Sequence, residues 1–323
     1  MTDERIPFQE VVDALLDTDR DFPRRFFSYF SDIDPTSLTH LMDAWPRVKP
    51  TRKRSLLDSL EATAQEDTLV SFDEFGRALL TDPDATVRVR AIRLLAECDD
   101  PKLVPTYIRI LQEDEDADVR AEAANALGKF VMLGELEEIP EKTHRAAEEA
   151  LLKNLNSEDD AMVRRRALES LGFSARVEVP TLLDSAYHRK DSDWQSSALL
   201  AMGRSGDDRW QEHVIQMLTH ENPRVQLAAV KAAGELGLAS ARPILLRLLE
   251  DAEDDDVIAA AIWSLSQIGG EDARTYLETL VAETDDEDLS AFLEDALENL
   301  AFTEDLDRFD LMSFDTGDEV EEE

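Results

Sequence analysis

The sequence predicts an all-α solenoid, in which short helix pairs stack along the chain. A motif that reads Val-Arg-x-x-Ala-x-x-Leu-Leu at Val87 recurs in variant form, and each copy presents the same small, apolar face. The steps between successive anchors are 32, 44, 31, 31, 32 and 32 residues. The anchors are Val87, Val119, Val163, Trp194, Val225, Val257 and Leu289. A nearly fixed period of this length is typical of stacked helical repeats.

Residues 1–80 precede the regular repeats, and we interpret them as a divergent helical cap region. Helices are expected over 9–16, 37–45, 52–64 and 72–80. Five aromatic residues between Phe22 and Phe30 favour a sealed solenoid end over an exposed docking patch, because a terminal repeat must cover an otherwise open core.

The chain has one dense basic cluster, which follows the second predicted helix. It consists of Arg47, Lys49, Arg52, Lys53 and Arg54. Two interpretations remain open: a solvated helix start, or a site for an acidic segment of this chain or of another.

Residues 81–300 form the repeat region. Position +4 from the anchor is alanine in six copies: Ala91, Ala123, Ala167, Ala198, Ala229 and Ala261. Positions zero, +4, +7 and +8 share one helix face, where small residues let neighbouring helices approach closely. Position +9 is glycine in four copies and predicts a helix end: Gly128, Gly172, Gly203 and Gly234.

Position −3 is a short acidic or amide residue in all seven copies. The residues are Asp84, Asp116, Asp160, Asp191, Asn222, Asp254 and Asp286. Such side chains accept the free N–H groups at a helix start, so they predict N-caps and not metal sites. A second apolar helix fills the rest of each copy, and examples that begin near a proline lie at Pro105, Pro180 and Pro243.

The segment from Asp116 to Gly128, Asp-x-x-Val-Arg-x-x-Ala-x-x-Ala-Leu-Gly, resembles a HEAT repeat. The alanine-rich form is similar to the HEAT-like repeats of phycobilisome lyases and of many bacterial and archaeal proteins. This resemblance implies a right-handed α-α superhelix with the anchor helices on its concave side. It also implies a ladder of Asp–Arg pairs at Arg88, Arg120 and Arg164, which Gln195, Gln226 and Ile258 would end.

Two segments depart from the period. The 44-residue step indicates an insertion of about 12 residues near 131–143, either a longer helix with a loop or a partner contact. Residues 301–323 form an acidic tail, with ten acids and one base from Glu304 onward, and composition predicts disorder. A short binding motif is the alternative to a solubilising tail; its candidate residues are Phe309, Leu311, Met312 and Phe314.

The composition limits the partners and the compartment. A net charge of −39 repels nucleic acids and anionic lipids, so we expect neither as a partner. No run of 18 apolar residues predicts a membrane span, and the N-terminus lacks the pattern of a signal peptide. The single cysteine, Cys98, excludes an intramolecular disulfide, and a cytoplasmic location is expected.

A search for chemistry finds no catalytic motif. The five histidines form neither His-x-x-x-His nor His-Glu-x-x-His, and the chain has no phosphate loop, nucleophile elbow or Cys-x-x-Cys pair. We therefore expect no catalytic, cofactor or metal site, and no enzyme activity.

Positions +2 and +6 of the anchor helices point away from the stacking face and are candidates for partner binding. They are Arg93, Asn125, Glu169, Leu200, Leu227, Lys231 and Trp263. Apolar residues in this set indicate a binding hot spot, unless supercoiling buries them. The sequence thus predicts a non-catalytic scaffold or adaptor that binds a protein or peptide on its concave surface. The net negative charge favours a basic partner. The alternative is an accessory subunit of an enzyme, including phycobilin-lyase-like chemistry, which the resemblance alone suggests.

Overall fold

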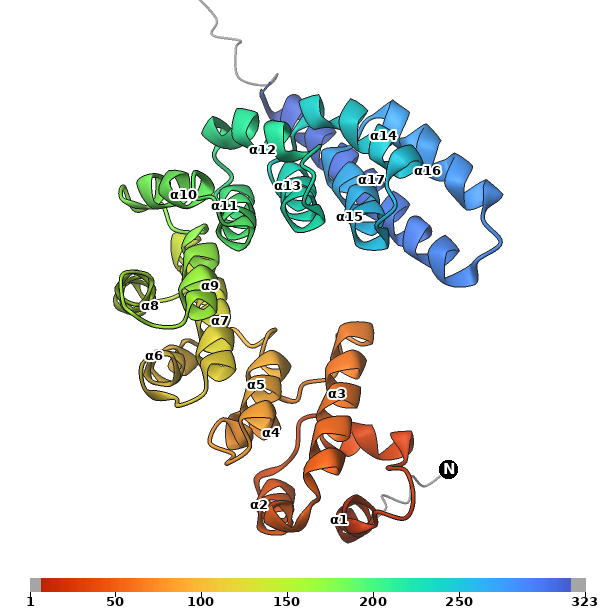
Figure 1. Ribbon diagram of the computed structural model, residues 1–323. Coiled ribbons are helices and arrows are strands. Elements are labelled where there is room, and N and C mark those ends of the chain that lie inside the picture. Colours follow the sequence, from red (N-terminus) through yellow and green to blue (C-terminus); the bar gives the residue numbers. More distant parts are fainter. Residues whose placement is uncertain (1–6, 315–323) are drawn as a thin grey trace, which may run out of the picture. The chain divides into compact units, whose positions relative to one another are not determined.

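The structure, a computed structural model, describes the backbone of residues 7–314 and the side chains of residues 7–305. Every regular element in this range is helical, which confirms the all-α class. The chain divides into two compact units, Met1–Ser170 and Leu171–Glu323 (Figure 1).

The first unit contains the helices of the cap region and the first repeats. They are α1 (Phe8–Leu16), α2 (Pro35–Ala44), α3 (Pro50–Glu66), α4 (Asp73–Leu79), α5 (Ala85–Leu94), α6 (Val104–Glu113), α7 (Ala117–Glu135) and α8 (Glu141–Leu155), followed by α9 (Ala161–Leu171), which ends at the unit boundary. Helix α5 packs against α3, α4 and α7, while α7 also packs against α6 and α8.

The second unit repeats one packing scheme. Its helices are α10 (Val179–Tyr187), α11 (Ser192–Arg204), α12 (Gln211–Met217), α13 (Pro223–Glu235), α14 (Arg242–Asp251), α15 (Asp255–Ile268), α16 (Glu271–Glu283) and α17 (Glu287–Phe314). Helices α11, α13, α15 and α17 pack side by side in one layer. Each of α10, α12, α14 and α16 packs on the helix that follows it, so the unit is built from helix pairs.

The predicted N-caps are confirmed in all seven copies. Each side chain at position −3 accepts a hydrogen bond from a backbone N–H two residues later, as Asp116 does from Asp118 at 2.9 Å. These bonds satisfy donors that a helix start leaves unpaired. The repeat therefore begins each anchor helix at the residue that the sequence indicates.

The alanine column is also confirmed as a packing face, since all six alanines are fully buried. The glycines at position +9 have a role beyond the predicted helix end. Gly128, Gly203 and Gly234 lie inside helices, and a Cβ on any of the four would come within about 3 Å of the next anchor helix. The glycines with positive φ after α11 and α13 are Gly206 and Gly237. Gly172 directly follows the last residue of α9, and Gly203 and Gly234 are the second-last residues of α11 and α13, whereas Gly128 lies far inside α7. The feature that all four share is the close approach of the next anchor helix.

The aromatic segment of the cap region packs into the first unit. Phe26 and Phe30 are buried, and the Phe30 ring centroid lies 5.2 Å from that of Phe75 on α4. Trp45 packs edge-on against the same ring at 5.3 Å. Two of the five aromatic side chains thus join the core of the first unit, while Phe22, Phe27 and Tyr29 are half-buried.

The basic cluster is used within the chain. Lys53 is buried, its Nζ lies 2.9 Å from Asp82 Oδ2, and the Trp45 indole N–H donates to the same carboxylate. Arg54 pairs with Asp84 at 2.9 Å. Arg52 donates to the backbone carbonyls of 17 and 20. The structure therefore favours an internal acidic segment as the occupant of this cluster.

The predicted arginine ladder is present at Arg88 and Arg120, whereas at its third position Arg164 Nε donates to the backbone carbonyl of Leu155. Arg88 holds Asp114 through two hydrogen bonds of 2.7 and 2.8 Å, and Arg120 pairs with Asp159 at 2.7 Å. Gln195 and Gln226, which replace arginine in the second unit, donate instead to the carbonyls of Tyr187 and Leu218. Arginine and glutamine at this position thus both donate hydrogen bonds to backbone carbonyls of the segment that precedes their own anchor helix.

Both irregular segments are largely helical in the described part of the chain. The insertion lengthens α7 to 19 residues and leaves a short connection before α8, as the longer-helix interpretation anticipated. Helix α17 continues past residue 300 to Phe314, where the sequence predicted a disordered tail. Thr303 donates to the Ser266 carbonyl and Arg274 pairs with Glu304 at 2.6 Å, which ties this extension to the repeats.

Candidate functional site

The predicted partner-binding residues fall into two groups, one in each unit. Arg93 and Asn125 lie in the first unit, on α5 and α7. Leu200, Leu227, Lys231 and Trp263 lie in the second, on α11, α13 and α15.

Three of the predicted residues line one groove in the second unit, which we name the Trp263 groove. It lies between α13 and α15 and has a volume of about 450 Å³. Leu227, Lys231, Glu235, Asp256, Trp263 and Gln267 are among its lining residues. The N-caps Asn222 and Asp254 start both helices at equivalent repeat positions, which brings the +2 and +6 side chains of one copy beside those of the next.

Trp263 is the main apolar feature of this groove. Its side chain is 41% exposed, although large aromatic residues usually bury most of their surface. The ring stacks on Phe292 of α17, with centroids 6.4 Å apart and planes inclined by 23°. Leu289, three residues before Phe292 on α17, is exposed as well. The indole is thus held in place by one neighbour while part of its surface stays open to a ligand.

The groove combines this apolar surface with both signs of charge. Lys231, Glu235 and Asp256 are exposed, and two of the three are acidic. A ligand with an apolar side chain flanked by a basic group would match this lining, since charge complementarity adds to apolar burial.

The group in the first unit lines a larger and more polar cavity of about 1020 Å³. Arg93 and Asn125 border it, and Arg93 pairs with Glu122 at 3.1 Å. Glu61 lines the same cavity; burial raises its pKa, an effect that the Arg93 charge partly offsets. Tyr107 also lines the cavity; its buried hydroxyl makes no hydrogen bond, and burial raises its pKa.

Two predicted residues are less open than expected. Glu169 is only 3% exposed, and its carboxylate pairs with Arg166 one turn earlier on α9 at 2.6 Å. Leu200 is half-buried on α11. Because it is buried, Glu169 is not available as a surface contact. The charge of Arg166 offsets the cost of burying its carboxylate.

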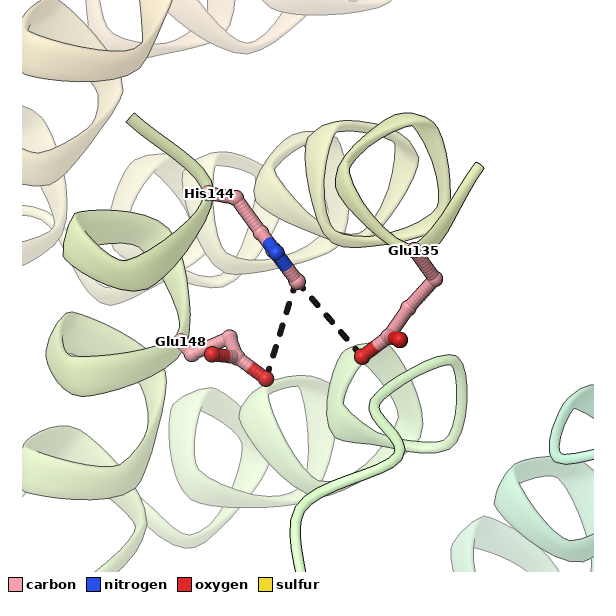
Figure 2. Close-up of side chains that lie close together, drawn as sticks. All are labelled: Glu135, His144 and Glu148. Atoms are coloured by element: carbon pink, nitrogen blue, oxygen red, sulfur yellow. Dashed lines mark ion pairs between the residues drawn. The ribbon is translucent and has the colours of Figure 1, made fainter. Parts of the chain in front are cut away.

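The search for histidine motifs missed one cluster, at the end of the insertion. Glu135, His144 and Glu148 converge there from α7 and α8, with possible ligand atoms all within 4.8 Å of one another (Figure 2). The sequence signal is His-x-x-x-Glu, which a search for paired histidines does not test. The contribution of Glu135 comes from another helix and has no local signature.

The candidate tail motif cannot be placed in the same way, because Phe309, Leu311, Met312 and Phe314 lie outside the residues whose side chains the structure describes. Among the described helices, none combines the length and the apolar character that crossing a bilayer requires.

Comparison with known proteins gives a family and a set of similar folds. A family described as HEAT repeats matches residues 73–171 and 211–298, which together make up more than half of the chain. No curated protein sequence matches the chain.

The solved structures that are similar to this chain have low sequence identity to it. YibA of Escherichia coli has a TM-score of 0.42 and 18% identity, over 77% of this chain and 98% of that one. The complex of CpcE and CpcF of phycocyanin lyase from a Nostoc species has a TM-score of 0.46 and 22% identity, over 71% and 94%. Human deoxyhypusine hydroxylase has a TM-score of 0.35 and 16% identity, over 81% and 95%. All three TM-scores are below 0.5, and all three identities are below 25%.

Proposed function

Because the chain belongs to the HEAT-repeat family, we propose that it is a non-catalytic scaffold or adaptor that binds a protein or peptide in the Trp263 groove. The observation that carries this proposal is the 41% exposed indole on a groove wall. Partly exposed tryptophans are enriched among residues that dominate binding energy. The stacked Phe292 fixes the ring before a ligand arrives, so little rotamer entropy is lost on binding.

The lining of the groove defines the expected ligand. An aliphatic or aromatic side chain would cover the open face of Trp263 and the half-buried Leu227. A lysine or arginine nearby would face Glu235 and Asp256. We therefore expect a peptide segment that places a basic residue within a few positions of a large apolar one.

Selection from a displayed library of random peptides tests this proposal. The dissociation constant of the best ligand is measured for the wild type and for Trp263→Ala. We expect at least about tenfold weaker binding in the variant, which corresponds to about 1.4 kcal/mol, because the main apolar contact is removed. The melting temperature should change little, since the indole is partly exposed.

Phe302→Ala is the matched control, because it removes a 63% exposed aromatic side chain of α17 that does not line the groove. Equal binding by the wild type and both variants would contradict the groove as the binding site. A large loss of stability in Trp263→Ala would indicate a core residue instead. Catalytic turnover by the isolated chain would contradict the non-catalytic assignment.

We also propose to test the tail motif separately, by truncation. The deletion should start at Phe309, because Thr303 and Glu304 contact the repeats and their removal would disturb the second unit. If the truncated chain retains every ligand with unchanged affinity, residues 309–314 do not form a binding motif.

A further inference from the structure

The cluster at the end of the insertion has the composition of a metal site. Glu135 is the last residue of α7, and His144 and Glu148 lie one turn apart near the start of α8. Their side chains point toward one another across the gap between the two helices (Figure 2). We propose that these three residues bind one divalent transition-metal ion, with Zn²⁺ as the probe. This inference does not depend on the scaffold function.

The distances favour coordination over a simple ion pair. His144 Nε2 lies 3.6 Å from Glu135 Oε1 and 3.7 Å from Glu148 Oε1. A charge-assisted hydrogen bond between these atoms would be about 2.7–2.9 Å long. Two ligand atoms that share one zinc ion at about 2.0–2.1 Å are roughly 3.4 Å apart in a tetrahedral site. The observed spacing is close to the second value.

The imidazole nitrogen is also placed as a ligand would be. Nε2 of His144 is buried and makes no hydrogen bond. A buried ring nitrogen without a partner is costly, because it has lost its water. A metal ion between Nε2 and the two carboxylates would satisfy it.

The local backbone makes room for the ring. A Cβ at Gly134 would lie 2.2 Å from Cγ of His144, so only glycine allows the imidazole to sit against α7. The helix then ends in a tight reversal, with Glu137 at φ 60° and N–H bonds from Glu137 and Glu138 to the carbonyls of Gly134 and Leu133. This is the Schellman arrangement, which turns the chain back so that α8 runs beside the end of α7.

The donor set selects the class of ion. One imidazole nitrogen and two carboxylates suit zinc and other first-row divalent metals, whereas Ca²⁺ and Mg²⁺ prefer oxygen ligands alone. Two carboxylates also balance the charge of a divalent cation. Three protein ligands leave a coordination position for water, and the ion would join α7 to α8 across the 136–140 connection.

Calorimetric titration of the metal-free full chain with Zn²⁺ tests the site. The buffer contains enough salt to screen weak binding by the acidic surface. We expect one high-affinity zinc ion per chain, and no saturable binding of Mg²⁺ at the same concentrations. Glu148→Gln should weaken zinc affinity by about 100-fold or more, because it removes a ligand oxygen charge while keeping the side-chain shape.

Two control variants keep the proposal falsifiable. Glu149→Gln changes an exposed carboxylate next in sequence, and His40→Ala removes an exposed imidazole of α2; both should bind zinc as the wild type does. Zinc should raise the melting temperature of the wild type and of both controls, but not that of Glu148→Gln. If circular dichroism shows that Glu148→Gln is unfolded, Glu135→Gln takes its place. Absence of tight zinc binding, or equal affinity in Glu148→Gln and Glu149→Gln, would overturn the proposal.

Discussion

At the scale of single residues, the glycines at position +9 show how closely the anchor helices approach. A Cβ at Gly172 would lie 2.5 Å from the carbonyl oxygen and 2.7 Å from the Cα of Ala201. Both are backbone atoms, so no side-chain movement can relieve the contact. Glycine is required here because the neighbouring helix backbone fills the space.

Replacing Gly172 with alanine should therefore lower the free energy of unfolding by about 1–3 kcal/mol, as overpacking does in other cores. Chemical denaturation measures the change. Gly206, which has φ 60° and open space around its Cα, gives a contrast. There asparagine should be tolerated better than alanine because it accepts the left-handed conformation. Unchanged stability in Gly172→Ala would contradict the close approach.

Ala229 gives a second prediction at this scale. It is fully buried on α13, which packs between α11 and α15. Ala229→Leu should cost roughly 1–3 kcal/mol, because three added carbons must displace the adjacent helices. Ala259→Leu, an exposed change on α15, should alter the unfolding free energy by less than about 0.5 kcal/mol. Similar effects in both variants would argue against the stacked alanine face.

At the scale of elements, the arginine ladder joins consecutive repeats of the first unit. Arg120 pairs with Asp159 before α9 and also donates to the Asp114 carbonyl before its own helix. One side chain thus fixes both the entry to its own helix and the loop of the following copy. Burial by itself would raise the pKa of Asp159, but the hydrogen bonds from Arg120, the backbone and Asn154 lower it below its ordinary value.

Arg120→Gln should lower the free energy of unfolding by about 1–3 kcal/mol, because a mostly buried carboxylate loses a charged hydrogen-bond partner. Arg224→Gln is the matched control, since Arg224 pairs with Asp193 at 3.4 Å while its side chain is 78% exposed. That pair should contribute less than about 1 kcal/mol. Denaturant midpoints for the two variants decide the comparison, and equal losses would contradict a special role for the ladder.

The same pair predicts a pH dependence. The pKa of an unfolded aspartate is about 3.9. A carboxyl group whose pKa is lowered by folding stabilises the native state at pH values above this. That contribution is lost as the pH falls through the lower pKa of the folded state. The stability gap between the wild type and Arg120→Gln should therefore be full at pH above about 5 and shrink below about 4. Thermal unfolding across this range measures the gap. A gap that widens on acidification would contradict the assigned sign.

At the scale of the whole molecule, the net charge of −39 acts on every part of the chain. Like charges repel one another in the compact state. Salt at about 0.1 M largely screens the repulsion between exposed charges that lie more than about 10 Å apart. The internal pairs of Lys53 and Arg88 lie in buried settings that salt screens much less.

Raising the ionic strength from about 0.02 M to about 0.5 M should therefore increase the melting temperature, because screened repulsion outweighs the weakening of exposed ion pairs. Sodium chloride, which is only weakly excluded from protein surfaces, is the suitable salt for scanning calorimetry. Association with a basic peptide should slow over the same range, since electrostatic steering is lost. A melting temperature that falls with salt would show that the ion pairs dominate instead.

Residue spacing along the chain was enough to predict the helical class, the repeat period, the alanine face and the start of each anchor helix. These features depend on neighbours within one or two helical turns, and their spacing is directly visible along the chain. Tertiary structure alone shows that Lys53 pairs with Asp82 inside the protein, that a neighbouring helix approaches Gly172 closely, and that Glu169 is buried. It also brings Glu135 together with His144 and Glu148. The physical reason is the same in each case: periodicity shows which face a side chain occupies, but the atoms that meet it belong to another helix, whose distance is set by packing.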